Sequence, residues 1–130
     1  MNPVTSLSLG RIGVGVASLV RPELVASTMG VGSSHPLLTQ WFGSREIALG
    51  AATLLASGSS RDTLVLIGAA VDGADAATAW AGIQNDLLPV KLGYGLTAVA
   101  AGATVAGLLS LRVSRKTARA LRKAQAAHSA

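Results

Sequence analysis

The sequence predicts an all-α integral membrane protein, a four-helix transmembrane bundle, from its low charge, its high hydropathy and its four long apolar runs. Charged residues make up 13% of the 130 residues, hydrophobic residues make up 50%, and the mean hydropathy is +0.50. A soluble domain usually has about 25% charged residues, so this chain has too few to cover a surface that faces water. The same composition excludes a disordered chain, and the absence of cysteine excludes a disulfide scaffold.

Each of the four apolar runs is long enough to cross a bilayer as a helix. They span residues 4–20, 41–57, 63–83 and 88–111. A hydrocarbon layer about 30 Å thick is crossed by roughly 20 helical residues. None of the runs alternates with a period of two, and their Leu, Ala, Val and Gly content suits helices. The chain has 15 glycines and only 3% aromatic residues, which predicts helices that pack by close backbone approach.

Turn residues separate the four runs. The pair Arg21 and Pro22 ends the first run, and residues 85–89 divide the third run from the fourth. Residues 57–62 are expected to form a tight turn, with Asp62 as the N-cap of the third helix.

The longest connection contains a short helical segment. Residues 22–29 begin with proline and are followed by Gly30, which is typical of a helix start and a helix stop. We expect this helix to lie at the membrane interface in the first outer loop rather than to cross the membrane.

The beginning of the chain does not predict a cleaved secretory signal. Residues 1–3 include no basic side chain, and Arg11 interrupts the first apolar run. Three further runs follow, so the first run is expected to remain as a membrane span.

The charge distribution orients the predicted bundle. The last 19 residues carry six cations and no acid, although the whole chain has a net charge of only +5. The positive-inside tendency predicts that this tail is cytoplasmic, and an even number of spans brings the N-terminus to the same side of the plasma membrane. We therefore expect a four-span bundle over residues 1–111 and a basic helical tail over 112–130. The tail residues expected to contact anionic lipid headgroups are Arg112, Arg115, Lys116, Arg119, Arg122 and Lys123.

The aromatic residues give an independent indication of orientation. Trp41 and Phe42 begin the second run, Trp80 lies near the end of the third, and Tyr94 lies near the start of the fourth. All four are therefore expected near the outer membrane face, where aromatic side chains form interfacial belts.

Six ionisable residues lie within the apolar runs or at their edges. They are Arg11, Arg45, Glu46, Asp72, Asp75 and Lys91. Because one such residue at a helix centre costs about 2.5–3.5 kcal/mol on insertion, these side chains are expected to face inward and pair. Asp72 and Asp75 are three residues apart and share a helix face. We expect Arg45 to bind both of these carboxylates, which leaves Glu46 for Arg11 or Lys91.

Two interpretations of this cluster stay open, together with a role between subunits. The cluster is either a structural clasp of buried ion pairs or a polar cavity that opens outward and binds a small ligand, a lipid headgroup or a proton. A pair of neighbouring carboxylates such as Asp72 and Asp75 can share a proton. A solvent-accessible pocket would favour binding or catalysis, and a closed knot of ion pairs would favour the clasp.

Small residues predict close helix packing. Ala98, Gly102 and Ala106 form a ladder with a spacing of four on the fourth run, and Gly50 and Gly68 lie in the second and third runs. Packing within the bundle explains them, and a homodimer face is the alternative.

Motifs of catalysis and of metal or nucleic-acid binding are missing from the sequence. It contains no GxSxG, HExxH, CxxC or Walker pattern, so no catalytic residue is assigned. His35 and His128 have no ligand partners at a suitable spacing, so no metal or cofactor is expected. The basic tail has no aromatic residues, which argues against a nucleic-acid partner.

Three stretches of the chain together resemble a known type of protein. The resemblance is carried by the segment WFGSREIALG at residues 41–50, by the series Arg11, Gly15 and Pro22, and by the DGAD element at residues 72–75. With them, the chain from about residue 7 to residue 110 resembles small bacterial four-helix membrane proteins of a domain-of-unknown-function family, some with a DoxX-like outline. The resemblance implies a four-span bundle that has these charged positions as its signature, and it implies no established activity.

Three function classes follow from the sequence. The first is a membrane protein that binds a small ligand or a lipid at the charged cluster. The second is a non-catalytic accessory or structural subunit of a larger membrane complex. The third is a membrane enzyme or a proton-coupled carrier that uses Asp72 or Asp75.

Overall fold

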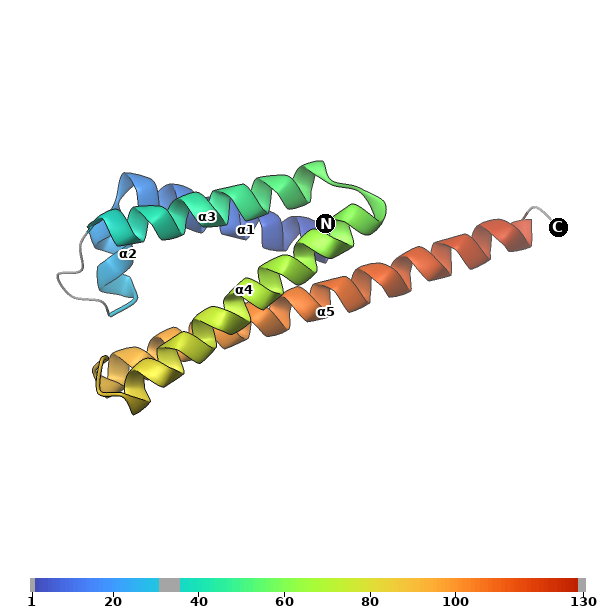
Figure 1. The fold of residues 1–130 in the computed structure, drawn as a ribbon. Helices are drawn as coiled ribbons and strands as arrows, with labels where there is room; N and C mark the ends of the chain where they lie inside the picture. The colour runs from blue at the N-terminus through green and yellow to red at the C-terminus, as the bar shows by residue number, and fades with distance from the viewer. Residues whose placement is uncertain (1, 31–35, 129–130) are drawn as a thin grey trace.

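The computed structural model describes residues 2–30 and 36–128, which form five helices and no strand (Figure 1). The prediction of an all-α fold is therefore confirmed. The helices are α1 (Pro3–Val20), α2 (Pro22–Thr28), α3 (Pro36–Leu55), α4 (Gly58–Gln84) and α5 (Val90–His128).

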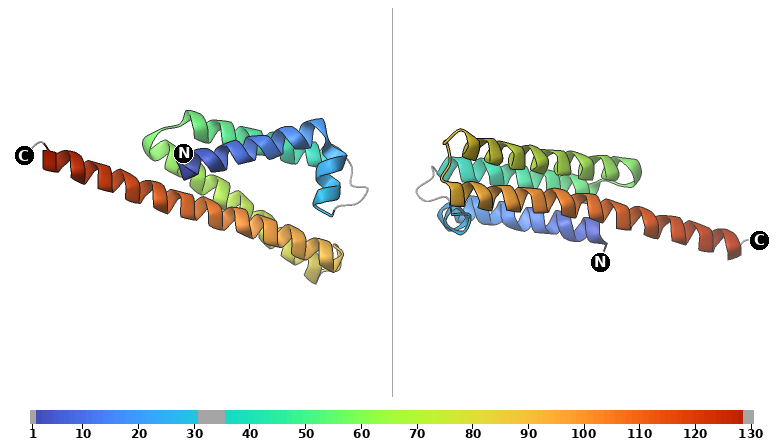
Figure 2. Two further views of the ribbon diagram at one scale, coloured as in Figure 1. Left: turned by 180° about the vertical axis from the view of Figure 1, so that it is seen from behind. Right: turned by 90° about the horizontal axis from the view of Figure 1, so that it is seen from below.

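The four long helices form two antiparallel pairs. Helix α1 packs along α3, and α4 packs along α5, whereas fewer contacts join one pair to the other. The pairs lie close together near the N-terminus and diverge toward α2 (Figure 1). The N-terminus and the α3–α4 turn lie at the end from which α5 projects, and α2 and the α4–α5 turn lie at the opposite end (Figure 2).

Glycines allow α1 and α3 to approach at backbone distance. A Cβ atom added at Gly15 would lie 2.6 Å from the Gly43 carbonyl oxygen, and one added at Gly50 would lie 2.7 Å from the Ser8 carbonyl oxygen. Real Cβ atoms do not occupy such positions, so these sites require glycine. Gly50 is thus a packing residue, as the sequence predicted.

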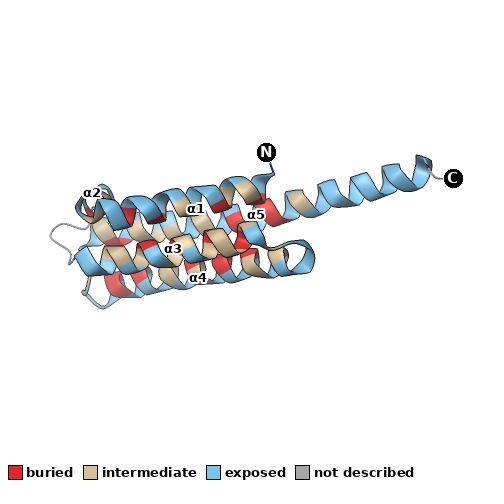
Figure 3. Cartoon of the chain, turned by 90° about the horizontal axis from the view of Figure 1, so that it is seen from above, coloured by how far each residue is buried: buried red, intermediate tan, exposed pale blue. Residues whose placement is uncertain are grey.

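Few residues of this fold are buried, and they lie along the faces where the helices meet (Figure 3). Val4, Val65 and Leu111 form a small buried apolar cluster where the two helix pairs converge. The buried polar or charged residues are Ser8, Ser18, Glu46, Thr53, Asp72 and Ser110. Many large apolar side chains are exposed, among them Val16, Ile67 and Val105. A surface of this kind is suited to contact with lipid.

Most buried hydroxyl groups are satisfied within their own helices, and Thr97 Oγ1 is an exception that has no hydrogen-bond partner among the described residues. Ser8 donates to the carbonyl oxygen of Val4 at 2.8 Å, and Thr53 donates to that of Leu49 at 2.7 Å. Ser110 donates to the carbonyl oxygen of Gly107 at 2.8 Å. Such local bonds satisfy a polar group where no water is available.

Three of the helices are long and apolar enough to cross a membrane, namely α1, α4 and α5. Helix α3 has a comparable length, but Arg45 and Glu46 at its middle lower its hydropathy. The count of four spans is therefore not confirmed by length and composition.

The third predicted helix begins earlier than expected. Ser57 is the extended residue before α4, and Gly58 adopts a φ of 56°, which reverses the chain within a few residues. Asp62 therefore lies inside α4, and the prediction that it caps this helix is wrong. Its carboxylate instead accepts a hydrogen bond from Arg115 Nε at 2.8 Å.

The other elements agree more closely with the sequence. The short helix appears as α2, and Gly30 follows it with a φ of 75°. Residues 85–89 separate α4 from α5 as expected. The fourth run and the basic tail form one continuous helix, α5, which ends at His128, so the helical tail is confirmed.

Gly43→Ala is expected to destabilise the protein by about 1–3 kcal/mol, the range for atoms forced into a packed contact. The new methyl group would lie 2.7 Å from both the Gly15 carbonyl oxygen and Ser18 Cβ. Gly13→Ala is the matched control, because a Cβ atom at Gly13 has no neighbour within 4 Å. Thermal unfolding in detergent, followed by circular dichroism, measures the difference. Equal midpoints for the two variants would contradict the close contact of α1 and α3.

Candidate functional site

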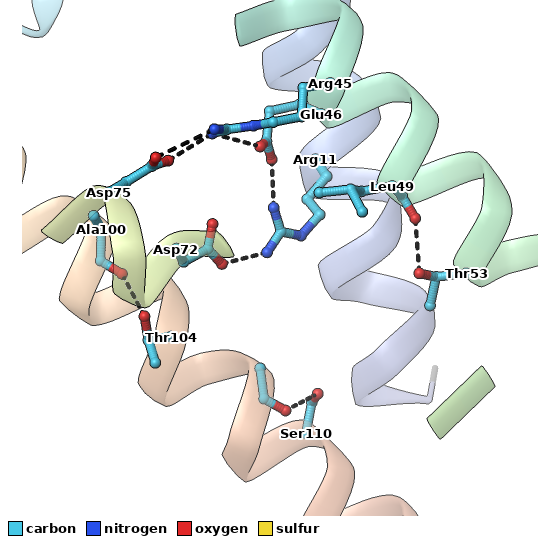
Figure 4. Close-up of polar contacts among 11 residues, drawn as sticks. Arg11, Arg45, Glu46, Leu49, Thr53, Asp72, Asp75, Ala100, Thr104 and Ser110 are labelled. Atoms are coloured by element: carbon cyan, nitrogen blue, oxygen red, sulfur yellow. Dashed lines mark hydrogen bonds and ion pairs between the residues drawn. The ribbon is translucent and has the colours of Figure 1, made fainter. Parts of the chain in front are cut away.

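Five charged side chains from three helices form one continuous network near the middle of the protein (Figure 4). Helix α1 supplies Arg11, α3 supplies Arg45 and Glu46, and α4 supplies Asp72 and Asp75. The network therefore links the α1–α3 pair to the α4–α5 pair.

Arg11 is the centre of the buried half of this network. Its Nη1 donates to Glu46 Oε2 at 2.6 Å, and its Nη2 donates to Asp72 Oδ2. The side chains of Arg11, Glu46 and Asp72 are only 10%, 6% and 7% exposed. Arg11 thus joins α1 to α3 and α4 by charge-assisted hydrogen bonds away from solvent.

Gly68 provides the space for the Arg11 guanidinium group. A Cβ atom added at Gly68 would lie 3.2 Å from Arg11 Nη2, which is tighter than most real contacts. The sequence predicted Gly68 as a helix-packing residue, and the structure places it against an arginine side chain.

Arg45 forms the exposed half of the network. Its Nη1 and Nη2 donate to Asp75 Oδ1 and Oδ2 at 3.3 and 2.7 Å, and Nη2 also lies 3.4 Å from Glu46 Oε1. The guanidinium carbon lies 5.2 Å from the centre of the Phe42 ring. The side chains of Arg45 and Asp75 are 34% and 42% exposed, so this pair is accessible.

The network resolves the pairing that the sequence left open. Arg45 binds Asp75, and Glu46 binds Arg11, as expected. Asp72 differs, because it binds Arg11 and has no ion pair with Arg45 in the described part of the chain. Lys91 is exposed in the first turn of α5, and no carboxylate of residues 2–30 and 36–128 lies within ion-pair distance of it. Its predicted place in the cluster is therefore wrong, since it lies near the end of α5, several turns from the other charges.

The five charges do not cancel. Two guanidinium groups face three carboxylates, so the network has a net charge of −1 when all its members are ionised.

A cavity of about 1150 Å³ lies between the two helix pairs and is bordered by all five members of the network. Its walls are otherwise mainly apolar, with Val14 from α1 and Val99, Ala103 and Leu109 from α5. The cavity therefore combines a long apolar wall with charged groups near its middle, the composition typical of a site for a small molecule.

The α5 wall of this cavity was not predicted from the sequence. Its residues include Leu96, Val99, Ala100, Ala103 and Ala106. They recur every three or four positions, so a helical period on the fourth run could have identified them as one face. What could not be predicted is that this face borders a cavity instead of another helix.

The predicted small-residue ladder on α5 is divided between two environments. Ala98, Gly102 and Ala106 are all exposed, and of the three only Ala106 lines the cavity. A Cβ atom added at Gly102 would have no neighbour within 4 Å. Helix α5 instead packs closely against α4 at two other glycines. Gly93 lies against Ile83, and Gly107 lies against Ala69.

The two ends of the helices hold different side chains. Near the α3–α4 turn, Arg61 Nη2 donates to Thr5 Oγ1 at 2.7 Å. Near the opposite end, the rings of Trp80 and Tyr94 lie 5.8 Å apart. The sequence missed the Arg61 contact, since it treated residues 57–62 as a turn.

The described residues contain no group of three or more His, Cys, Asp or Glu side chains that could hold a metal ion. His128 lies at the end of α5, with Nδ1 2.9 Å from the Ala124 carbonyl oxygen. His35 lies outside the described residues.

Comparison of the chain with protein-family models, with curated proteins and with solved structures finds no match. The resemblance to small four-helix membrane proteins with a DoxX-like outline therefore stays a prediction.

Asp72→Asn is expected to destabilise the protein by about 1.5–3 kcal/mol, the range for a hydrogen bond between charged groups. The substitution leaves the buried Arg11 cation with one carboxylate instead of two. Thermal unfolding in detergent measures the loss. Asp62→Asn is the matched control, because it weakens an exposed pair with Arg115 and should cost less than about 1 kcal/mol. An unchanged midpoint for Asp72→Asn would show that the Arg11–Asp72 contact does not hold the helix pairs together.

Proposed function

We propose that the chain is a four-span plasma-membrane protein that binds an amphiphilic small molecule or a lipid in its central cavity. The observation that carries this proposal is the combination of a cavity of about 1150 Å³ with a charged network on one of its apolar walls.

The membrane placement is supported by the outer surface. Helices α1, α4 and α5 have the length and hydropathy of spans. Helix α3 packs antiparallel against α1. It is the proposed fourth span. Its charges, Arg45 and Glu46, are paired inside the network, so they do not face lipid unpaired.

The orientation is supported by the two ends. The basic tail and Arg61 lie at the end that holds the N-terminus, which we place in the cytoplasm. Trp41, Trp80 and Tyr94 lie near the opposite end, which we place at the outer interface.

The position of the cavity favours a lipid-like ligand. The cavity extends between α1 and α5, and several of its lining side chains are also exposed on the surface, including Val14, Val99 and Leu109. In a membrane this side faces acyl chains, so an apolar molecule can enter from the bilayer without first crossing water.

The network favours a particular head group. Its net charge of −1 and its accessible Asp75 favour a head group that is cationic or that donates hydrogen bonds. Asp75 is the accessible carboxylate, while Arg11, Glu46 and Asp72 form the closed part. The buried half then acts as the clasp and the exposed half as the recognition site.

Ala103→Phe is expected to abolish retention of a bound amphiphile, because the new ring occupies the cavity that Ala103 lines. Ala101→Phe is the matched control, since Ala101 is exposed and does not line this cavity. Native mass spectrometry of protein purified from its own membrane measures the bound species. The expected pattern is a ligand adduct in the unmodified protein and in Ala101→Phe, and none in Ala103→Phe. The same adducts in all three, or in none, would contradict ligand binding in the cavity.

Asp75→Asn is expected to reduce that adduct at least severalfold with less loss of thermal stability than Asp72→Asn. The reason is that Asp75 is partly exposed, whereas Asp72 is almost fully buried. Adduct intensity and unfolding midpoint are measured on the same samples. An unchanged adduct in Asp75→Asn would show that this carboxylate does not contact the head group.

A further inference from the structure

A second, smaller groove lies on the α4–α5 pair. It has a volume of about 400 Å³ and is lined by Leu66 from α4 and by residues of α5. The α5 residues are Val105, Leu108, Leu109, Leu111, Arg112 and Arg115. The groove is thus apolar along most of its length, and two arginines border its end near the tail.

The two arginines are available to an external anion. Arg112 is exposed, and no carboxylate of the described residues lies within ion-pair distance of it. Arg115 is bound by Asp62 through Nε, and its side chain is still 52% exposed. One carboxylate therefore faces two guanidinium groups, which leaves a local charge of +1.

The groove covers about two thirds of the depth of one leaflet of a bilayer. From Arg112 back to Val105 is seven residues, or about 10 Å along the helix axis. One half of the hydrocarbon layer is about 15 Å thick. A phospholipid with one acyl chain in the groove therefore has its phosphate group beside Arg112 and Arg115. These arginines lie at the end from which the basic tail projects (Figure 1).

We propose that this groove is a binding site for an anionic phospholipid of the inner leaflet, with the phosphate on Arg112 and Arg115 and one acyl chain along Leu66, Val105 and Leu108. Guanidinium groups bind phosphate oxygens with paired hydrogen bonds, and the apolar groove supplies the contact that free phosphate lacks. This site rests on the membrane placement proposed above but not on a ligand in the central cavity.

The remaining tail cations differ from this pair. The other four cations, Lys116, Arg119, Arg122 and Lys123, are exposed and do not border the groove. The part of α5 that projects beyond the other helices is exposed along most of its length (Figure 3). These four cations attract an anionic surface by charge alone. The proposal therefore separates one defined lipid site from the general attraction of the tail.

The test measures the thermal midpoint of the full chain in a neutral detergent during titration with phosphatidylglycerol. Phosphatidylcholine tests the need for negative charge, and glycerol phosphate tests the head group without acyl chains. Arg112→Gln is compared with Arg119→Gln, which removes the same charge from the same helix face, seven residues further along the tail. Val105→Phe obstructs the groove and leaves both arginines in place.

We expect phosphatidylglycerol to raise the thermal midpoint of the unmodified protein. The Arg112→Gln variant should need about fivefold more of this lipid for the same rise, and the Arg119→Gln variant should need nearly the same amount as the unmodified protein. Val105→Phe should weaken the same response, and the other two ligands should give none. Equal weakening by Arg112→Gln and Arg119→Gln would overturn the proposal in favour of diffuse attraction. Equal stabilisation by phosphatidylcholine or by glycerol phosphate would also overturn it. Ala103→Phe should not alter this response, so failure of the central-cavity proposal is distinguishable.

Discussion

The fold depends on one buried cation, the Arg11 guanidinium group, held between Glu46 and Asp72. Within each helix pair, small residues bring backbones close, as at Gly15 and Gly43. Between the pairs, direct contacts are fewer. The ion pairs connect them near the middle, and the apolar cluster of Val4, Val65 and Leu111 connects them where they converge. Because removal of one partner from a buried pair leaves a charge without compensation, the helix pairs cannot separate at this level without a large cost. The central cavity lies between the two helix pairs, beside this network, and no side chain of residues 2–30 and 36–128 fills it.

A lipid medium around the helices would account for the polar groups inside the protein. Glu46, Asp72 and the hydroxyl groups of Ser8 and Ser110 are buried, while large apolar side chains cover the surface. In water this distribution would remove the main driving force for folding, since little apolar surface is buried. In lipid the association of helices depends on close packing and on satisfied polar groups, and both are present. The exposed Asp62–Arg115 pair, in contrast, is partly solvated and contributes far less than the Arg11 pairs.

The sequence predicted the helical fold and most of the site, because helical periodicity and the cost of unpaired charge are local properties. Buried positions on α1 include Val4, Ser8, Gly15 and Ser18, and Arg11 falls in the same series of three and four. Glu46 falls in the corresponding series of α3, between Gly43 and Gly50. The partner of Asp72 was not predictable, since Asp72 and Asp75 differ in height by only about 4.5 Å along the helix. The relative height of two helices depends on where each begins, and α4 begins at Gly58, before the expected start. The cavity escaped prediction for a similar reason, because it depends on the divergence of the helix pairs (Figure 1).

Small side chains on α5 leave the central cavity open. Ala100, Ala103 and Ala106 line it on α5, where larger residues would have filled the volume. The cavity is open to the surface, because lining side chains such as Val99 and Leu109 are themselves exposed. Its apolar walls therefore add to the apolar surface of the molecule, which is unfavourable in water and suited to an apolar medium. The closed ion pairs around Arg11 hold the helix pairs beside this cavity, and the more exposed pair of Arg45 and Asp75 borders it.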